Sequence, residues 1–192
     1  GLPETGLGIL PGWGGTVRLP RLAGYSIAVQ WITSGSQQKP EAALAAGAVD
    51  KVVAPEALRE ESLKLLAELA DGSRDYSARR SQKLSPLTET SEALSGMSDK
   101  FQSMIQGSTG NHYPAPIKVV ELITKAATAG RDEAIALENL AFYEISQTPQ
   151  ARALVGLFLS DQFIAKRAKG YALALGEKLP PVAQAGVIGA GI

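Results

Sequence analysis

The stretch that decides the fold is "GLPETGLGILPGWGGTVRLPRLAG", residues 1–24. It contains seven glycines, three prolines and a single carboxylate, Glu4. The pair Gly14-Gly15 allows two backbone segments to approach closely, and Pro20 limits how far a following helix can continue. The stretch therefore predicts a structured loop that leads into a short helix.

Glu4 is the candidate chemical group of this loop. It follows Pro3 and precedes a glycine-rich turn, so its backbone is restricted, as the backbone of a preorganised acid or base must be. The loop also leads into a helix start, where free N–H groups favour negative charge. Two interpretations stay open on these residues alone: a catalytic carboxylate, or a residue that only caps or decorates the loop.

The composition excludes several classes of protein and site. The 192 residues carry 19 basic and 19 acidic side chains, which argues against a nucleic-acid partner. There is no Cys and His112 is the sole histidine, so disulfides, thiolate metal sites and multi-His sites are excluded. The longest apolar runs are too short for a membrane span. We expect a soluble intracellular protein that handles a small molecule, cytoplasmic if its source is bacterial, with an organellar parent as the alternative.

Helical spacing of apolar residues dominates the rest of the chain. Ser26 and Thr148 are expected N-caps, and Gly35 is an expected helix stop. The polar segment 71–90 is expected to be an irregular connection, and "VDKVV" (49–53) is typical of a short strand. The pattern predicts a mainly α chain with helices over 25–35, 40–46, about fifteen residues from 55, 91–106, 116–128, 131–146 and 149–169.

The C-terminal "VIGAGI" supplies Gly189 and Gly191, the first two glycines of G-x-G-x-x-G, after a predicted strand at 184–188. That motif lets backbone approach a pyrophosphate at a helix N-terminus. An ordinary glycine-rich tail explains the same residues. In either case we expect no cofactor to bind this chain, because the third glycine and the following helix are missing from it.

Several segments resemble a known family in order along the chain. The opening stretch, followed by "ITSG", "PEAALAAGAVDKVV" and "PEAL", closely resembles the second half of a crotonase-fold enoyl-CoA hydratase domain. The segments "HYPAP", "GRDEAIALEN" and "ARALVGLFLSDQ" resemble the linker of the multifunctional fatty-acid β-oxidation α-subunit. "GVIGAGI" resembles the opening of that protein's NAD-binding 3-hydroxyacyl-CoA dehydrogenase domain.

The resemblance implies a domain organisation. Residues 1–70 would be the C-terminal part of an α/β crotonase domain, 71–178 a helical linker region, and 179–192 the first strand of a Rossmann-type domain. It also implies an acyl-CoA thioester substrate, NAD for the dehydrogenase of the parent protein, a thiolase β-subunit as partner, and frequent isomerase activity.

The resemblance assigns Glu4 a chemical role. Members of the family hydrate a trans-2-enoyl-CoA with two glutamates: one carboxylate activates water for attack at C3, and the other supplies a proton at C2. Backbone N–H groups hold the thioester oxygen. Glu4 would be the second carboxylate. The first one and the oxyanion donors are not in this sequence, so we expect the isolated chain to be inactive.

Other residues carry weaker expectations. The resemblance matches Asp161 to a substrate-contacting aspartate, whereas a solvated helix acid is the alternative. Leu7, Gly8 and Gly12 could line the acyl pocket beside Glu4, although loop geometry explains the glycines equally well. Trp13 is expected to pack on apolar surface, with the pocket border as alternative.

Rival readings of the whole chain also stay open. Arg79, Arg80 and Lys83 form a basic run that is either a solvated connection or a contact for CoA phosphates. The chain as a whole could instead be a non-catalytic helical assembly module, or belong to a monofunctional dehydrogenase with an N-terminal extension. The hydratase-like match over 1–53 argues against the last reading.

Overall fold

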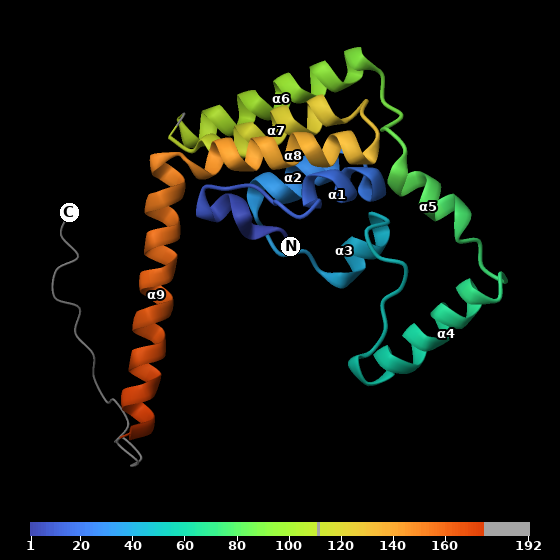
Figure 1. Ribbon diagram of the computed structural model, residues 1–192, viewed down its shortest axis with the longest axis horizontal. Coiled ribbons are helices and arrows are strands. Elements are labelled where there is room, and N and C mark those ends of the chain that lie inside the picture. The colour runs from blue at the N-terminus through green and yellow to red at the C-terminus, as the bar shows by residue number, and fades with distance from the viewer. Residues whose placement is uncertain (111, 175–192) are drawn as a thin grey trace. The chain divides into compact units, whose positions relative to one another are not determined.

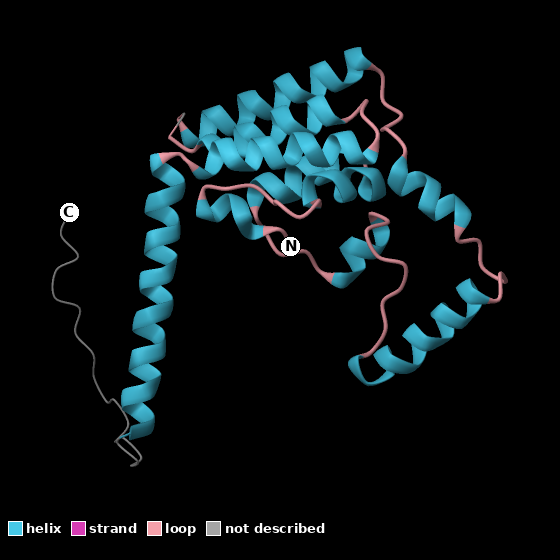
Figure 2. Ribbon diagram, viewed as in Figure 1, coloured by secondary structure: helices cyan, strands magenta, loops and turns pink. Residues whose placement is uncertain are grey.

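The computed structural model describes residues 1–110 and 112–174 (Figure 1). Within them the chain is helix and loop, with no strand (Figure 2). The mainly α character is therefore confirmed. The elements are η1 (Pro3–Leu7), α1 (Gly15–Ala23), α2 (Tyr25–Ser34), α3 (Pro40–Ala45), η2 (Pro55–Ala57), α4 (Leu58–Ala70), α5 (Ser77–Leu84), α6 (Ser91–Thr109), α7 (Pro114–Ala126), α8 (Arg131–Ser146) and α9 (Pro149–Ala174).

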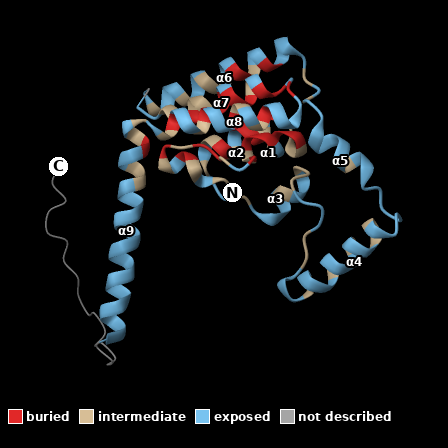
Figure 3. Ribbon diagram, viewed as in Figure 1, coloured by how far each residue is buried: buried red, intermediate tan, exposed pale blue. Residues whose placement is uncertain are grey.

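The chain divides into two compact units, residues 1–156 and 157–192. The core of the first unit is built around α7, which contacts α1, α2, α6 and α8. The buried residues of these helices face one another (Figure 3). The largest cluster includes Tyr25, Val29, Ile32, Leu94, Val119, Val120, Ile123, Ala141 and Ile145.

Helix α7 has the central place because it carries a broad buried face, made up of Ala115, Pro116, Val119, Val120, Leu122, Ile123 and Ala126. Pro114 occupies its first turn, where a missing N–H costs nothing. Val119, Val120 and Ile123 are almost completely buried, and each such side chain contributes about 1.5–3 kcal/mol of hydrophobic stabilisation. A broad apolar face needs more than one neighbouring element to cover it, and α1, α2, α6 and α8 contact α7.

Several local signals in the sequence correctly predicted where helices begin or end. Helix α8 covers 131–146 as predicted, and Gly35 ends α2 with a φ of 62°. Thr148 caps α9, because its Oγ1 accepts the backbone N–H of Ala151 at 3.2 Å. Pro40 opens α3 as expected.

Three local predictions were wrong. Residues 49–53 form no strand, since no other extended segment in the described chain lies beside them to share hydrogen bonds. The connection at 71–90 contains α5, whose start is stabilised by Asp75: its Oδ1 accepts the N–H of Ser77 at 2.7 Å. Ser26 does not cap α2, because Gly24 holds that position. The predicted strand at 184–188 lies outside the described residues.

The second unit is described from Leu157 to Ala174, the greater part of α9. Here the guanidinium of Arg167 lies 5.5 Å from the ring centroid of Phe163 and 5.6 Å from that of Tyr171. The helix predicted over 149–169 is confirmed, and its large apolar side chains Leu157, Phe158 and Ile164 are exposed. Across the described residues, helices are too short or too polar to cross a membrane.

Candidate functional site

Glu4 lies in the 3-10 helix η1, half-buried, at the bend that the sequence predicted. The helix ends at Gly8, whose φ of 71° permits its N–H to bond the carbonyl of Thr5 at 3.0 Å. Ile9 donates its N–H to the carbonyl of Glu4 at 3.2 Å. These two hydrogen bonds fold the backbone back onto the residues next to Glu4. Oε2 of the Glu4 carboxylate is buried without a hydrogen-bond partner among the described residues.

Glu4 is one wall of a pocket of about 330 Å³. Apolar side chains of Leu2, Leu19 and Leu22 supply other walls. Glu4 is the only carboxylate among the described residues that line it. The full lining is Leu2, Glu4, Pro11, Trp13, Gly14, Gly15, Arg18, Leu19 and Leu22. The pocket therefore combines apolar walls with one carboxylate residue, the kind of side chain that serves as a general acid or base.

The segment that carries Glu4 is anchored to α2. The hydroxyl of Thr5, which is buried, donates to the carbonyl of Ile32 at 2.8 Å, near the end of α2. Gly35 is the first residue after α2, and a Cβ on Gly35 would lie 3.4 Å from the Cα of Pro3. The close approach of these two segments fixes where η1 begins and therefore where the Glu4 carboxylate lies.

Another part of the pocket lining, at Gly14, is anchored to α8. Glu138, which has no exposed surface, accepts hydrogen bonds from the backbone N–H groups of Gly14 at 2.5 Å and Thr16 at 3.0 Å. Sequence reasoning missed this residue. The signal was present, because Glu138 shares a helical face with Ala134, Ala141 and Ile145, all of them buried.

Leu7, Gly8 and Gly12 are not among the residues that line the Glu4 pocket. Both glycines instead have packing reasons. A Cβ on Gly8 would lie 3.0 Å from the backbone of Ala151, and one on Gly12 would lie 2.8 Å from the ring of Phe142. The structure thus favours loop geometry for the glycines.

Trp13 corrects a prediction. Its side chain is 93% exposed, so it does not pack on an apolar surface within the described chain. It does line the Glu4 pocket, as the alternative proposed. Trp13 directly precedes Gly14, where the chain turns with a φ of 81°.

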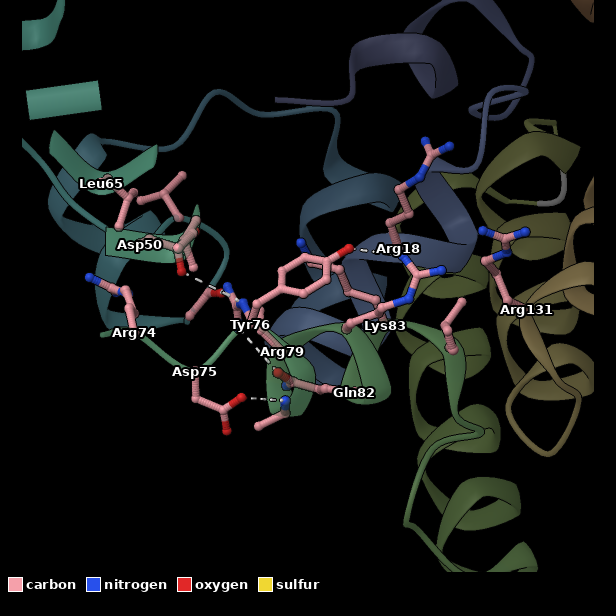
Figure 4. A pocket seen from close by; sticks show the side chains of 16 residues that line it. Arg18, Asp50, Leu65, Arg74, Asp75, Tyr76, Arg79, Gln82, Lys83 and Arg131 are labelled. Atoms are coloured by element: carbon pink, nitrogen blue, oxygen red, sulfur yellow. Dashed lines mark hydrogen bonds and ion pairs between the residues drawn. The ribbon is translucent and has the colours of Figure 1, made fainter. Parts of the chain in front are cut away.

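A second and larger pocket, of about 700 Å³, lies among α1, α4 and α5 (Figure 4). Leu65 and Leu69 give it an apolar part, and Arg18 lines both this pocket and the Glu4 pocket. Its cationic side chains are Arg18, Arg74, Arg79, Arg80, Lys83 and Arg131, against the two carboxylates of Asp50 and Asp75.

Some of these cations are already engaged. Arg79 donates to the carbonyl of Gly47 at 2.7 Å and lies 3.7 Å from the carboxylate of Asp50. Arg80 donates to the hydroxyl of Tyr76 at 2.8 Å and lies over its ring. The basic run predicted at 79–83 is therefore on a helix and faces a cavity, and the excess positive charge suits an anionic ligand.

The remaining predicted residues are not brought to these pockets. Asp161 is an exposed residue of α9 in the second unit, without a hydrogen bond or ion pair in the described chain. His112 is exposed in the turn before α7. Gly189 and Gly191 lie outside the described residues. The described part contains no cluster of side chains able to hold a metal ion.

The carboxylate, its pocket and the glycine-rich loop all lie within one stretch that matches a known family. Residues 1–112 match the sequence model of the enoyl-CoA hydratase/isomerase family. That stretch is more than half of the chain and includes η1 and the helices from α1 to α6. The chain belongs to the enoyl-CoA hydratase/isomerase family.

Proposed function

We propose that Glu4 is one of two catalytic carboxylates in the hydration of a 2-enoyl-CoA thioester. The observation that carries the proposal is a carboxylate whose buried Oε2 has no partner among the described residues, on a residue that lines a partly apolar pocket. In hydration, the oxygen of water bonds to C3 and a second carboxylate takes the water's proton. Glu4 gives its proton to C2 and regains one when the enzyme is reset.

The second carboxylate is proposed to come from outside these 192 residues. The family's reaction needs an acid and a base on the two carbons of the double bond, and the Glu4 pocket supplies one carboxylate from its described lining. Donors for the thioester oxygen would come from the same source. The 192-residue chain alone is therefore proposed to be inactive.

The two pockets together suit a long anionic substrate. The Glu4 pocket has apolar walls, as an acyl chain requires, and the α4–α5 pocket carries a positive excess, as CoA phosphates require. Arg18 lines both. We propose that the thioester lies at Glu4 and that the phosphates of CoA reach Arg80 and Lys83.

The parent protein is proposed to be the α-subunit of a fatty-acid β-oxidation complex. The resemblance of 130–139 and 151–162 to its linker supports this, as does the G-x-G of Gly189 and Gly191. In such a protein NAD would bind at Gly189, Gly191 and the residues that follow them, Asp161 would contact substrate, and a thiolase β-subunit would be the partner. The product of hydration, a 3-hydroxyacyl-CoA, is the substrate that such a dehydrogenase oxidises.

The test is an assay of two activities in three proteins. The 192-residue chain, the same chain extended upstream along its reading frame, and one extended in both directions are each given crotonyl-CoA, with and without NAD. We expect hydration only in the two extended proteins and NADH formation only in the third. Hydration by none of them would overturn the hydratase proposal, and hydration without NADH formation would overturn the dehydrogenase part alone.

A further inference from the structure

Glu138 is a fully buried carboxylate on the third turn of α8, outside the segment that matches the hydratase family. Its Oε1 accepts the N–H of Gly14 at 2.5 Å, and its Oε2 accepts both the N–H and the hydroxyl of Thr16. Three donors thus meet the two oxygens of one side chain. A buried charge with this number of partners is a specific arrangement, because an unpaired one would be strongly unfavourable.

These donors belong to the start of α1. The N–H groups of the first helical turn have no partner within their own helix, and they attract negative charge. The N-cap of α1 is Gly14, so no side chain of that residue can satisfy them. Glu138, more than 120 positions further along the chain, accepts hydrogen bonds from N–H groups at the start of α1, as the side chain of an N-cap residue normally does.

Helix α8 holds the same loop at a second point. The ring of Phe142 lies against Gly12, where a Cβ would be 2.8 Å from the ring. Glu138 and Phe142 are four positions apart, so both project from one face of α8. The loop from Gly12 to Thr16 is therefore held by a carboxylate and an aromatic ring of a single helix face.

The held loop is also a wall of the Glu4 pocket. Trp13, Gly14 and Gly15 line that pocket together with Glu4, which is itself anchored through Thr5 to α2. We propose that Glu138 is a positioning residue for the Glu4 site: it fixes the wall on which substrate lies without touching substrate. This inference rests on the proposed hydratase function, and it adds a residue of α8, beyond the segment that matches the family, to a pocket whose lining lies within that segment.

The substitution Glu138→Gln tests the carboxylate without changing side-chain size. An amide has one oxygen, so its NH₂ group would face either the N–H of Gly14 or the two donors of Thr16, and at least one donor would lose its acceptor. The matched control is Glu144→Gln on the same helix, an exposed carboxylate that pairs with Lys118 at 2.5 Å. Thr16→Val is a milder second variant that removes one of the three donors.

The first measurement uses the 192-residue chain and amide hydrogen exchange. In Glu138→Gln we expect exchange at Gly14 and Thr16 to accelerate by about tenfold or more, as expected when a charge-assisted bond is lost. Ile123, in the core, should keep its wild-type rate. Unchanged exchange at Gly14 and Thr16 would overturn the claim that Glu138 holds the loop. If Glu138→Gln does not fold, Thr16→Val decides by the same criterion.

The second measurement uses the upstream-extended protein and crotonyl-CoA hydration, at a temperature where each variant is folded. We expect kcat to fall about tenfold or more in Glu138→Gln, with a smaller change in KM, because misplacing a site wall weakens the transition state more than binding. Glu144→Gln should match wild type. An unchanged kcat in Glu138→Gln would overturn the positioning role.

The two measurements separate this inference from the proposal on which it rests. If the wild-type extended protein does not hydrate crotonyl-CoA, the hydratase proposal fails and the positioning role fails with it. The exchange data then still decide whether Glu138 holds the loop. If the wild-type extended protein is active and the kcat of Glu138→Gln equals that of the Glu144→Gln control, the positioning inference is wrong and the hydratase proposal stands.

Discussion

Arg21 donates a hydrogen bond from Nη2 to the carbonyl of Ala129 at 2.9 Å, which joins α1 to the turn between α7 and α8. Its Nε donates to the carbonyl of Ser85 at 3.0 Å, and the side chain is almost completely buried. Ala129 lies beyond the segment that matches the hydratase family. The family segment and the helices after it therefore share one core.

Replacing Arg21 should break that connection. Arg21→Met keeps the length of the side chain but leaves two carbonyls of other elements without this donor. We expect the free energy of unfolding to fall by about 2–4 kcal/mol. The measurement is urea denaturation, with Arg59→Met on an exposed part of α4 as the matched control. Equal stability of the two variants would contradict the account of the shared core.

Tyr25 should make stability depend on alkaline pH. Burial raises the pKa of Tyr25, while hydrogen bonds with Thr124 and Ser98 oppose that rise. Its hydroxyl donates to Thr124 at 2.7 Å, since the Thr124 hydroxyl itself donates to Val120. The pKa of Tyr25 in the unfolded chain is about 10. Just above that pH the unfolded chain has released the Tyr25 proton, whereas the folded state still keeps it.

The sign of the Tyr25 contribution follows from that difference. The contribution of Tyr25 to the free energy of unfolding is fully present below the pKa of Tyr25 in the unfolded chain. It is lost as the pH rises from that value through the higher pKa of Tyr25 in the folded state. Unfolding free energies at about pH 8 and about pH 11 should therefore differ more in wild type than in Tyr25→Phe, which lacks the ionising group. An identical pH dependence in the two proteins would show that Tyr25 does not titrate in this way.

Gly8 should resist substitution for two separate reasons. Its φ is 71°, and an added Cβ would lie 3.0 Å from the backbone of Ala151. Gly72 has a φ of 80° with nothing within 4 Å of such a Cβ. We expect Gly72→Ala to cost about 1–2 kcal/mol from backbone strain alone, and Gly8→Ala about 2–5 kcal/mol. Thermal denaturation compares them; equal costs would mean that η1 does not pack against α9 at Ala151.

Lys83 should affect substrate binding more than chemistry. If the α4–α5 pocket holds CoA phosphates, Lys83→Gln in the upstream-extended protein should raise KM for crotonyl-CoA about threefold to tenfold and leave kcat near wild type. The rise should shrink at high salt, because exposed charges are screened. Lys64→Gln, an exposed lysine outside the pocket, is the control. Equal KM values for Lys83→Gln, Lys64→Gln and wild type would contradict the proposal that this pocket holds the phosphates of CoA.

Local signals predicted most helices but not the contacts among them. The bounds of α8 followed from Gly130, helical spacing and the turn before Pro149, which are all properties of neighbouring residues. The strand at 49–53 was wrong because a strand depends on a partner that local sequence does not reveal. Helix α5 was missed because its sequence is polar, although Asp75 gave a cap signal.

The candidate site was predictable only in part. Glu4 stood out through its proline and glycine neighbours, but its anchor Thr5 and the second anchor Glu138 did not. The bond from Thr5 spans 27 positions and those to Glu138 span more than 120. Contacts of such separation depend on how helices pack, and periodicity can flag Glu138 as buried without naming its partners.

The most direct test of the central claim is the rate of crotonyl-CoA hydration in the upstream-extended protein with Glu4→Gln. The amide keeps the shape of the side chain but cannot exchange a proton at C2, so we expect kcat to fall at least about a hundredfold. Glu41→Gln, at the exposed start of α3, should keep the wild-type rate. A wild-type rate in Glu4→Gln would contradict the assignment of Glu4 as a catalytic carboxylate.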